Sequence, residues 1–221
     1  VIGGDGSMIT AARACAPRHI PLVGIHLGKL GFLTDIYPHE CVQCLRDILA
    51  GKYLEEKRPL LQLGHFEQGE HTHLGLAMNE IVLHRSEHLQ MINYDLYVND
   101  RFLHSHYADG MIISTPTGST AYALSAGGPL VHPHLKATLL IPLCSHKLNA
   151  KPLIISMEDS IKIVFKPEKS SQGAIYLDGR LVKSVQNETE FHVSTAPDEV
   201  TLIHPTQYDY LHTLKTKLGW Q

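Results

Sequence analysis

The pattern of apolar and polar positions changes character near Arg58. Before this point short apolar stretches alternate with amphipathic ones, and Val42, Leu45 and Ile48 recur at helical spacing. Ser7 can cap a helix that follows the first apolar pair. This order of strand, helix, strand and helix is typical of half of an open parallel α/β sheet. The expected elements are strands at 1–2 and 22–25 and helices over 7–14 and 38–49.

After Arg58 the pattern predicts short strands separated by turns. Gln68-Gly69, Asn99-Asp100 and Asp178-Gly179 each stand between apolar or alternating runs, as the turns of β-hairpins do. A last segment, 208–218, has helical spacing and is expected to pack back on the chain. Strands are expected over 60–66, 74–83, 91–98, 111–114, 138–141, 153–156, 161–165, 174–177, 191–194 and 200–203.

The predicted fold class is an N-terminal α/β domain followed by a β-rich, sandwich-like domain. The parallel sheet of the first domain is expected to be incomplete at its N-terminus. We place the α/β domain at 1–58, completed by the tail 205–221, and the β-rich domain at 59–204. Ligands of open parallel sheets bind at the carboxyl ends of the strands.

Charge and composition exclude several functional classes. The chain has 19 basic and 22 acidic residues and a net charge of -3, which argues against binding to nucleic acid or to an anionic membrane. No apolar run approaches the roughly 18 to 20 residues of a membrane span. Four cysteines are too few for a disulfide scaffold, and no export signal precedes Val1-Ile2. A cytoplasmic protein that lacks an upstream segment is expected.

The segment Gly3-Gly4-Asp5-Gly6 stands where a strand is expected to end and a helix to begin. Free backbone N–H groups and the helix dipole favour a phosphate there, and glycines let a ligand approach the backbone. A carboxylate in such a turn is unfavourable unless it accepts a proton from a hydroxyl or belongs to a metal site. The alternative interpretation is a plain Asp-Gly turn.

Two further segments carry polar groups beside apolar strands. Asn79 and Glu80 interrupt an apolar run, and the pair suits a nucleoside, because Asn can bind a purine edge while Glu accepts from ribose hydroxyls. The alternative is a strand bulge with one side chain in solvent. In 109–122 a buried strand runs into Thr-Pro-Thr-Gly-Ser-Thr-Ala-Tyr, which has more hydroxyls than helix capping needs. This surplus favours contacts to a nucleotide or phosphate.

Two other patterns resemble known sites less well. Cys41-x-x-Cys44 beside His39 could form half of a zinc site, but no second ligand pair stands at the required spacing, so packing on a helix face is favoured. The segment 24–30 superficially resembles a phosphate-binding loop. Its glycine spacing is one residue short, and Leu30 stands where Ser or Thr must hold magnesium.

In this order, Gly-Gly-Asp-Gly at 3–6, Asn-Glu at 79–80 and the run at 109–122 closely resemble the NAD kinase family over nearly the whole chain. The resemblance implies transfer of the terminal phosphoryl group of ATP, or of polyphosphate, to the 2'-hydroxyl of the adenosine ribose of NAD, giving NADP. It also implies a divalent cation, Mg²⁺ or Mn²⁺, an active site in the cleft between the two domains, and a homo-oligomer, a dimer or a tetramer. No nucleic acid or membrane partner is implied.

The same resemblance assigns roles to individual residues. Asp5 falls at the general base, phosphates are expected at Gly3, Gly4 and Gly6, and no residue is expected to bind the metal directly. Asp109 is expected to reach the nicotinamide end of NAD from a neighbouring subunit. The residues implied around NAD are Gly6, Phe32, Asn79, Glu80, Tyr107, Asp109, Thr117, Thr120, Ala121, Tyr122, Ser125 and Arg180.

The chain departs from the family pattern at a few positions. Tyr107 and Gln90 stand where basic side chains are common, Ser145 replaces a usual Pro, and Arg180 stands where Gln is frequent. The first strand and helix of the family, which supply a phosphate-side loop, have no counterpart. Two other functions compete with an NAD kinase: a lipid or diacylglycerol-type kinase of the same superfamily, and a catalytically silent NAD-binding module.

Overall fold

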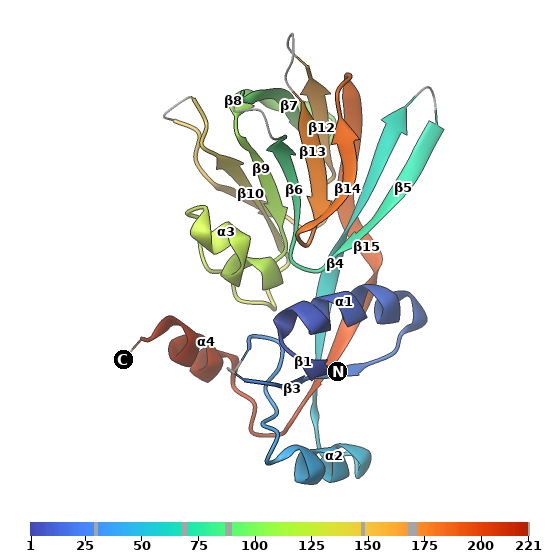
Figure 1. The fold of residues 1–221 in the computed structure, drawn as a ribbon, viewed down its shortest axis with the longest axis vertical. Coiled ribbons are helices and arrows are strands. Elements are labelled where there is room, and N and C mark those ends of the chain that lie inside the picture. Colours follow the sequence, from blue (N-terminus) through green and yellow to red (C-terminus); the bar gives the residue numbers. More distant parts are fainter. Residues whose placement is uncertain (29–30, 68–69, 87–89, 147–148, 168–171, 221) are drawn as a thin grey trace. The chain divides into compact units, whose positions relative to one another are not determined.

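The chain forms two units in a computed structural model that describes residues 1–28, 31–67, 70–86, 90–146, 149–167 and 172–220 (Figure 1). The first unit comprises Val1–Arg58 and Asp198–Gln221, and the second comprises Pro59–Pro197. Two long strands, β4 (Leu54–Glu67) and β15 (Thr189–His204), contribute residues to both units.

The first unit has short parallel strands and helices. Strand β1 (Ile2–Gly3) pairs in parallel with β3 (Ile25–His26), and β2 (Leu22–Val23) pairs in parallel with the end of β15. Figure 1 shows α1 and α2 on opposite sides of these strands. The helices are α1 (Asp5–Cys15), the 3-10 turn η1 (Ala16–Arg18), α2 (Cys41–Leu49) and α4 (Tyr210–Leu218).

Two details of the predicted helices are wrong. Helix α1 begins at Asp5 rather than Ser7, because the extended residue Gly4 is the N-cap and its carbonyl already accepts from the Ser7 and Met8 amides. Ser7 therefore lies inside the first turn and caps nothing. Helix α2 begins at Cys41 rather than Pro38, because Pro38–Glu40 form a turn that precedes it.

The second unit consists of two antiparallel sheets, as the hairpin signals predict. One sheet has the strand order β11-β10-β9-β6-β13-β14, and the other has the order β5-β4-β15-β12-β7-β8. Two short helical elements, η2 (Thr117–Thr120) and α3 (Tyr122–Ser125), follow β9. The new strands are β5 (Glu70–Ala77), β6 (Glu80–Arg85), β7 (Ile92–Val98), β8 (Arg101–Ala108), β9 (Gly110–Ser114), β10 (Ala137–Leu143), β11 (Leu153–Ser156), β12 (Ile161–Lys166), β13 (Gly173–Leu177) and β14 (Arg180–Val185).

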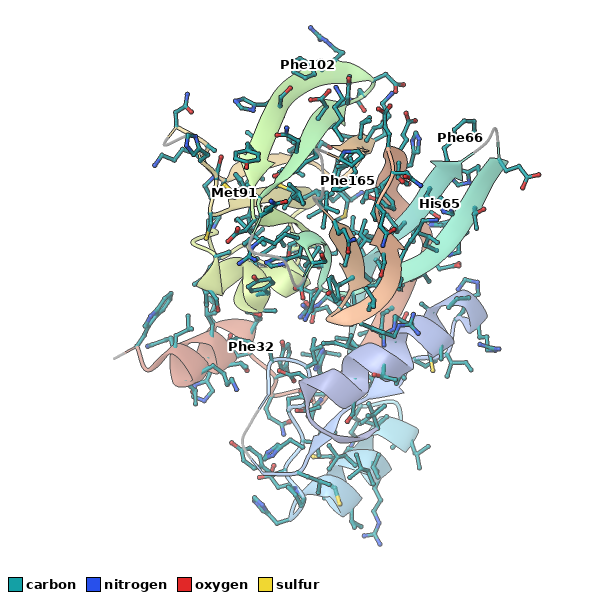
Figure 2. All side chains as sticks on the ribbon, turned by 45° about the horizontal axis from the view of Figure 1, so that its top comes forward. Phe32, His65, Phe66, Met91, Phe102 and Phe165 are labelled. Carbon is teal, nitrogen blue, oxygen red and sulfur yellow. The ribbon has the colours of Figure 1, made fainter. Side chains whose placement is uncertain are left out.

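Apolar side chains from both sheets form a large buried cluster in the second unit. Leu63, Leu83, Phe165 and Phe191 belong to it and are almost fully buried. Phe165 lies among these side chains, whereas Phe102 lies on the outer hairpin formed by β7 and β8 (Figure 2). The α/β first unit and the β-rich second unit confirm the predicted fold class.

Two of the three predicted hairpin turns are present. Asn99 and Asp100, and likewise Asp178 and Gly179, have positive φ angles of 50°, 59°, 46° and 76°, as the turns of two-residue hairpins require. Gln68-Gly69 lie outside the described residues. The predicted strand over 74–83 is wrong, because the chain leaves one sheet at Ala77 and enters the other at Glu80.

Candidate active site

The Asp5 carboxylate is held by the loop that follows β3. Its Oδ2 accepts the amide N–H of Phe32 at 2.8 Å, and its Oδ1 accepts that of Leu33 at 2.9 Å. A Cβ atom at Gly31 would lie 2.0 Å from Asp5 Oδ1, so this close approach requires glycine. Each carboxylate oxygen keeps a second lone pair, which can accept a proton from a ligand hydroxyl.

The glycines around Asp5 leave the start of α1 open. A Cβ atom at Gly4 or at Gly6 would have no other atom within 4 Å, whereas one at Gly3 would lie 2.4 Å from Ser7 Oγ. Packing inside this unit therefore explains Gly3 but leaves Gly4 and Gly6 without a steric reason. Free N–H groups at the start of a helix can bind an anion that approaches this open backbone.

Phe32 lies between the Asp5 loop and the C-terminal helix. Its side chain is half-buried, and the Lys217 ammonium lies 5.5 Å from the centre of its ring. Phe32 is labelled in Figure 2. The same residue thus holds Asp5 through its backbone and presents an aromatic face beside a cation.

Asn79 and Glu80 lie at the crossover where the chain passes between the two sheets of the second unit. Hydrogen bonds to carbonyl oxygens hold the backbone of this segment. Thr115 Oγ1 donates to Met78 O at 2.6 Å, and Ser114 Oγ donates to Asn79 O at 3.1 Å. The Thr115 amide also donates to Asn79 O at 2.9 Å. This segment and the Thr-Pro-Thr run, which lie far apart in the sequence, are therefore in direct contact.

Glu80 combines burial with an unused hydrogen-bonding atom. The residue is 6% exposed, and its Oε2 has no hydrogen-bond partner among the described residues. Burial, and then the negative charge of Asp178, raises the pKa of Glu80 to about 7. Buried polar atoms in proteins are normally paired, so this carboxyl suits a ligand that brings hydroxyl donors.

The hydroxyls of the run at 114–122 are directed mainly to the backbone. Ser119 Oγ donates to Pro116 O at 2.7 Å, and Thr120 Oγ1 donates to Thr117 O at 3.1 Å. A Cβ atom at Gly118 would lie 2.3 Å from Asn79 O, so glycine is needed where the run crosses the 78–80 segment. The surplus of hydroxyls that suggested ligand contacts is largely explained by the shape of this loop.

Helix α3 presents two implied NAD-binding residues to solvent. Tyr122 is 43% exposed, and Ser125 lies one turn further along and is also exposed. Ala121 is half-buried and Thr117 is buried.

Asp109 forms an ion pair within its own chain. Arg85 Nε donates to Asp109 Oδ1 at 2.8 Å, and the Arg85 amide donates to Asp109 O, also at 2.8 Å. Tyr107 is 39% exposed, and its ring centre lies 6.1 Å from that of His146. Asp109 is therefore fixed in orientation while staying 24% exposed.

The remaining predicted positions are less directly connected to these groups. Arg180 is the exposed first residue of β14, Gln90 is exposed, and Ser145 is half-buried. Cys44 packs in the core of the first unit, and the described residues contain no group of three or more ligand side chains that could hold a metal ion. In the rejected phosphate-binding loop, residues 29–30 lie outside the described part of the chain.

Sequence reasoning missed Asp178. Its carboxylate accepts the amide N–H groups of Met78, Asn79 and Glu80 at 3.0, 2.8 and 3.1 Å. The Asp178-Gly179 dipeptide predicts a turn, and a turn explains it locally, so nothing in the pattern points to a partner so far away along the chain.

Sequence reasoning also missed the buried charge network of the first unit, formed by Asp35, Glu56, Arg58 and His204. His204 Nδ1 lies 2.9 Å from Asp35 Oδ2, and its Nε2 lies 3.2 Å from Glu56 Oε2. Arg58 Nη2 donates to the same Glu56 oxygen at 2.8 Å. Burial alone would raise the pKa of Glu56, but His204 and Arg58 lower it to about 2. Burial alone would lower the pKa of His204, but the two carboxylates raise it.

Comparisons with known proteins identify the family of the chain. Residues 1–53 match the ATP-NAD kinase N-terminal domain, and residues 78–205 match the ATP-NAD kinase C-terminal domain. The chain is 44% identical over 221 residues to an NAD kinase of Tolumonas auensis, covering 100% of this chain and 75% of that protein. It is 44% identical over 222 residues to an NAD kinase of Coxiella burnetii (strain Dugway 5J108-111), covering 100% of this chain and 74% of that protein.

Solved structures give the same result. A crystal structure of yeast NADH kinase complexed with NADH has a TM-score of 0.90 and 27% identity, and the match covers 100% of this chain and 65% of that one. An NAD kinase from Archaeoglobus fulgidus in complex with ATP has a TM-score of 0.76 and 27% identity, covering 99% of this chain and 80% of that one. The sequence and the fold together show that the chain belongs to the ATP–NAD kinase family, enzymes that phosphorylate NAD with ATP.

Proposed function

We propose that this chain transfers the terminal phosphoryl group of ATP to the 2'-hydroxyl of the adenosine ribose of NAD, with Asp5 as the general base. Asn79 and Glu80 bind the adenosine, Phe32 contacts the adenine, and Tyr122 and Ser125 line the adenosine side of the site. Polyphosphate is proposed as an alternative donor. The family relationship supports the reaction, and the local geometry supports the division of roles.

The observation that carries this proposal is the Glu80 carboxyl. It is buried and fixed by its backbone, and its Oε2 has no hydrogen-bond partner in the described part of the chain. A ribose offers two neighbouring hydroxyl donors, which such a carboxylate can accept. The adjacent Asn79 amide can both donate and accept, which suits a purine edge.

Asp5 suits the role of base because its carboxylate is already oriented. The Phe32 and Leu33 amides fix both oxygens, so little freedom remains to be lost when a hydroxyl binds. Phosphoryl transfer depends mainly on positioning and on charge stabilisation, with a carboxylate accepting the proton of the attacking hydroxyl.

A divalent cation would bind to this chain together with the donor phosphates. Magnesium commonly keeps several waters and binds through substrate phosphates and one or two carboxylates. Asp5 is assigned the role of base and no residue is assigned as a direct metal ligand, while the open backbone at Gly4 and Gly6 leaves room for the phosphates that the cation would bind. When bound, the cation neutralises negative charge on the phosphates, while Asp5 holds the proton of the hydroxyl.

The test is NADP formation from NAD, magnesium and either ATP or polyphosphate by the wild type, Asp5→Asn and Glu55→Gln. Glu55 is an exposed carboxylate of the same unit and serves as the matched control. We expect Asp5→Asn to lower turnover by about 10²-fold or more and Glu55→Gln to leave it unchanged. NAD affinity, measured by calorimetry, should stay within about twofold of wild type in both variants.

Two results would contradict the proposal. A loss of less than about tenfold in Asp5→Asn would remove Asp5 from the role of base. A wild type that binds NAD but forms no NADP with either donor would instead identify an NAD-binding module without catalysis. Because Asn offers one acceptor oxygen where Asp5 has two, the melting temperature of the variant is measured beside its turnover.

We also propose a homo-oligomer in the cytoplasm, in which Asp109 reaches NAD bound by a partner copy. Its partial exposure and its fixed orientation beside Arg85 support this role. A chain of this length with only four scattered cysteines suits a reducing compartment. No helix in the described part of the chain is long and apolar enough to cross a membrane. Light scattering of the purified protein tests the oligomer.

A further inference from the structure

We propose that Asp178 is a positioning residue for NAD: its carboxylate holds the backbone at 78–80 and thereby presents the Asn79 and Glu80 side chains to the adenosine. This inference rests on the proposed function of Asn79 and Glu80. Asp178 itself is assigned no contact with the substrate.

Asp178 both accepts hydrogen bonds from the 78–80 segment and donates one to it. Its Oδ1 accepts from the Asn79 and Glu80 amides at 2.8 and 3.1 Å, and its Oδ2 accepts from the Met78 amide at 3.0 Å. The Asp178 amide in turn donates to Glu80 O at 3.0 Å. One residue therefore satisfies three successive N–H groups and one carbonyl at the point where the chain changes sheets.

These bonds matter because no strand pairing is available to the crossover. Strand β5 ends at Ala77 and β6 begins at Glu80, so the Met78 and Asn79 amides have no ladder partners of their own. Thr115 and Ser114 occupy the carbonyls on the other side, as described above. Hydrogen bonds thus hold both the carbonyls and the N–H groups of the crossover. The Asp178 carboxylate accepts from all three N–H groups at 78–80.

The hairpin turn fixes where this carboxylate points. Asp178 and Gly179 both have positive φ angles, of 46° and 76°, which set a two-residue turn between β13 and β14. Because the turn determines the backbone direction at Asp178, two paired strands place its side chain on the crossover.

Asp178 also acts on the Glu80 carboxyl through its charge. Its negative charge adds to burial in raising the pKa of Glu80 to about 7. Ser114, opposite Glu80 on β9, and Leu177, at the end of β13, are neutral, so among the described residues Asp178 is the charged group that faces Glu80. Removing this charge lowers the pKa of Glu80 and extends its ionised form to lower pH.

Two variants separate the geometry from the charge. Asp178→Asn keeps Oδ1 as acceptor for Asn79 and Glu80 but loses the charge and the bond from Met78. Asp178→Ala loses all three bonds. The matched control is Asp100→Asn, which changes an aspartate in the other two-residue hairpin turn, where the side chain is 84% exposed and faces Lys162.

The experiment measures NAD affinity by calorimetry across pH, together with kcat and the KM values for NAD and for ATP. We expect Asp178→Ala to raise the dissociation constant of NAD by about tenfold or more, Asp178→Asn to raise it less, and the KM for ATP to stay within about twofold in both. In wild type, NAD affinity should fall as the pH drops below about 7. In Asp178→Asn this fall should begin at a lower pH. Asp100→Asn should match wild type in all of these values.

Several results would overturn the inference. One is an unchanged NAD dissociation constant in both Asp178 variants. Another is an equal loss of affinity for NAD and for ATP with an unchanged pH profile of NAD binding, since a general loss of structure gives that pattern. If Asp178→Ala fails to fold, Asp178→Asn decides alone, through a rise in its NAD dissociation constant without a rise in the KM for ATP, together with the direction of its pH shift. Failure of the proposed function is distinguishable, because then wild type itself would not bind NAD or form NADP.

Discussion

Replacing Glu56 by Gln tests whether the buried charge network stabilises the first unit. Glu56 is 8% exposed and lies against His204 and Arg58, which lower its pKa from 4.5 to about 2 in the folded chain. A shift of this size corresponds to about 3 kcal/mol, and screening by solvent reduces the expected contribution to about 2 kcal/mol. Glu56→Gln should lose this contribution at neutral pH.

The sign of the pH dependence follows from the lowered pKa. A carboxyl whose pKa is lower in the folded state binds a proton more readily when the chain unfolds, so its contribution is complete above about pH 4.5 and is lost as the pH falls toward about 2. Because the charged His204 imidazole helps to lower the pKa of Glu56, the free energies of unfolding of wild type and Glu56→Gln should differ most above about pH 5 and below the pH at which His204 loses its proton. The difference should narrow by about 2 kcal/mol in acid.

Urea unfolding at a series of pH values measures this difference. Glu55→Gln is the control, because Glu55 is the neighbouring residue on β4 and is exposed. A difference between wild type and Glu56→Gln that stays constant from neutral pH into acid would refute the reasoning, since it would mean that protonation of Glu56 is not linked to folding. The reasoning would also be refuted if the difference in the free energy of unfolding between wild type and Glu55→Gln narrowed in the same way.

Two glycine substitutions give further predictions. Gly6→Ala should leave the melting temperature equal or higher, because the new Cβ meets no atom within 4 Å and alanine favours a helix. Turnover of the Gly6→Ala variant should fall. Full activity would show that no phosphate approaches this backbone. Gly118→Ala should destabilise the chain by about 1 to 3 kcal/mol in urea unfolding and weaken NAD binding, because its Cβ would lie 2.3 Å from Asn79 O. Unchanged stability and affinity would show that the crossover tolerates displacement.

Short-range patterns predict the fold class and the local setting of several candidate site residues. The glycine-rich turn between β1 and α1 follows from three glycines after an apolar pair, and the turn at Asp178-Gly179 follows from a dipeptide with a strong hairpin preference. The split of 74–83 into two strands did not follow, because apolar residues continue across Met78 and periodicity cannot show that a buried chain changes sheets.

The features that the sequence does not predict depend on contacts between residues far apart along the chain. Asp178 bonds to Met78 across a separation of 100 residues, and His204 pairs with Asp35 across 169. Charged residues such as Glu56 and Arg58 are usually solvated, so a sequence gives no sign that they are buried together. Their burial becomes visible when the partners from distant segments are seen in place.

The division of the chain into units affects the order in which they can form during synthesis. The second unit, Pro59–Pro197, is one continuous segment, whereas the first unit joins Val1–Arg58 to Asp198–Gln221. Strand β2 pairs with Leu202 and Ile203, and the buried charge network needs His204. On the ribosome the second unit can therefore fold while the first still lacks its last strand and His204. Residues 1–58 can complete their unit only after the end of β15 has been translated.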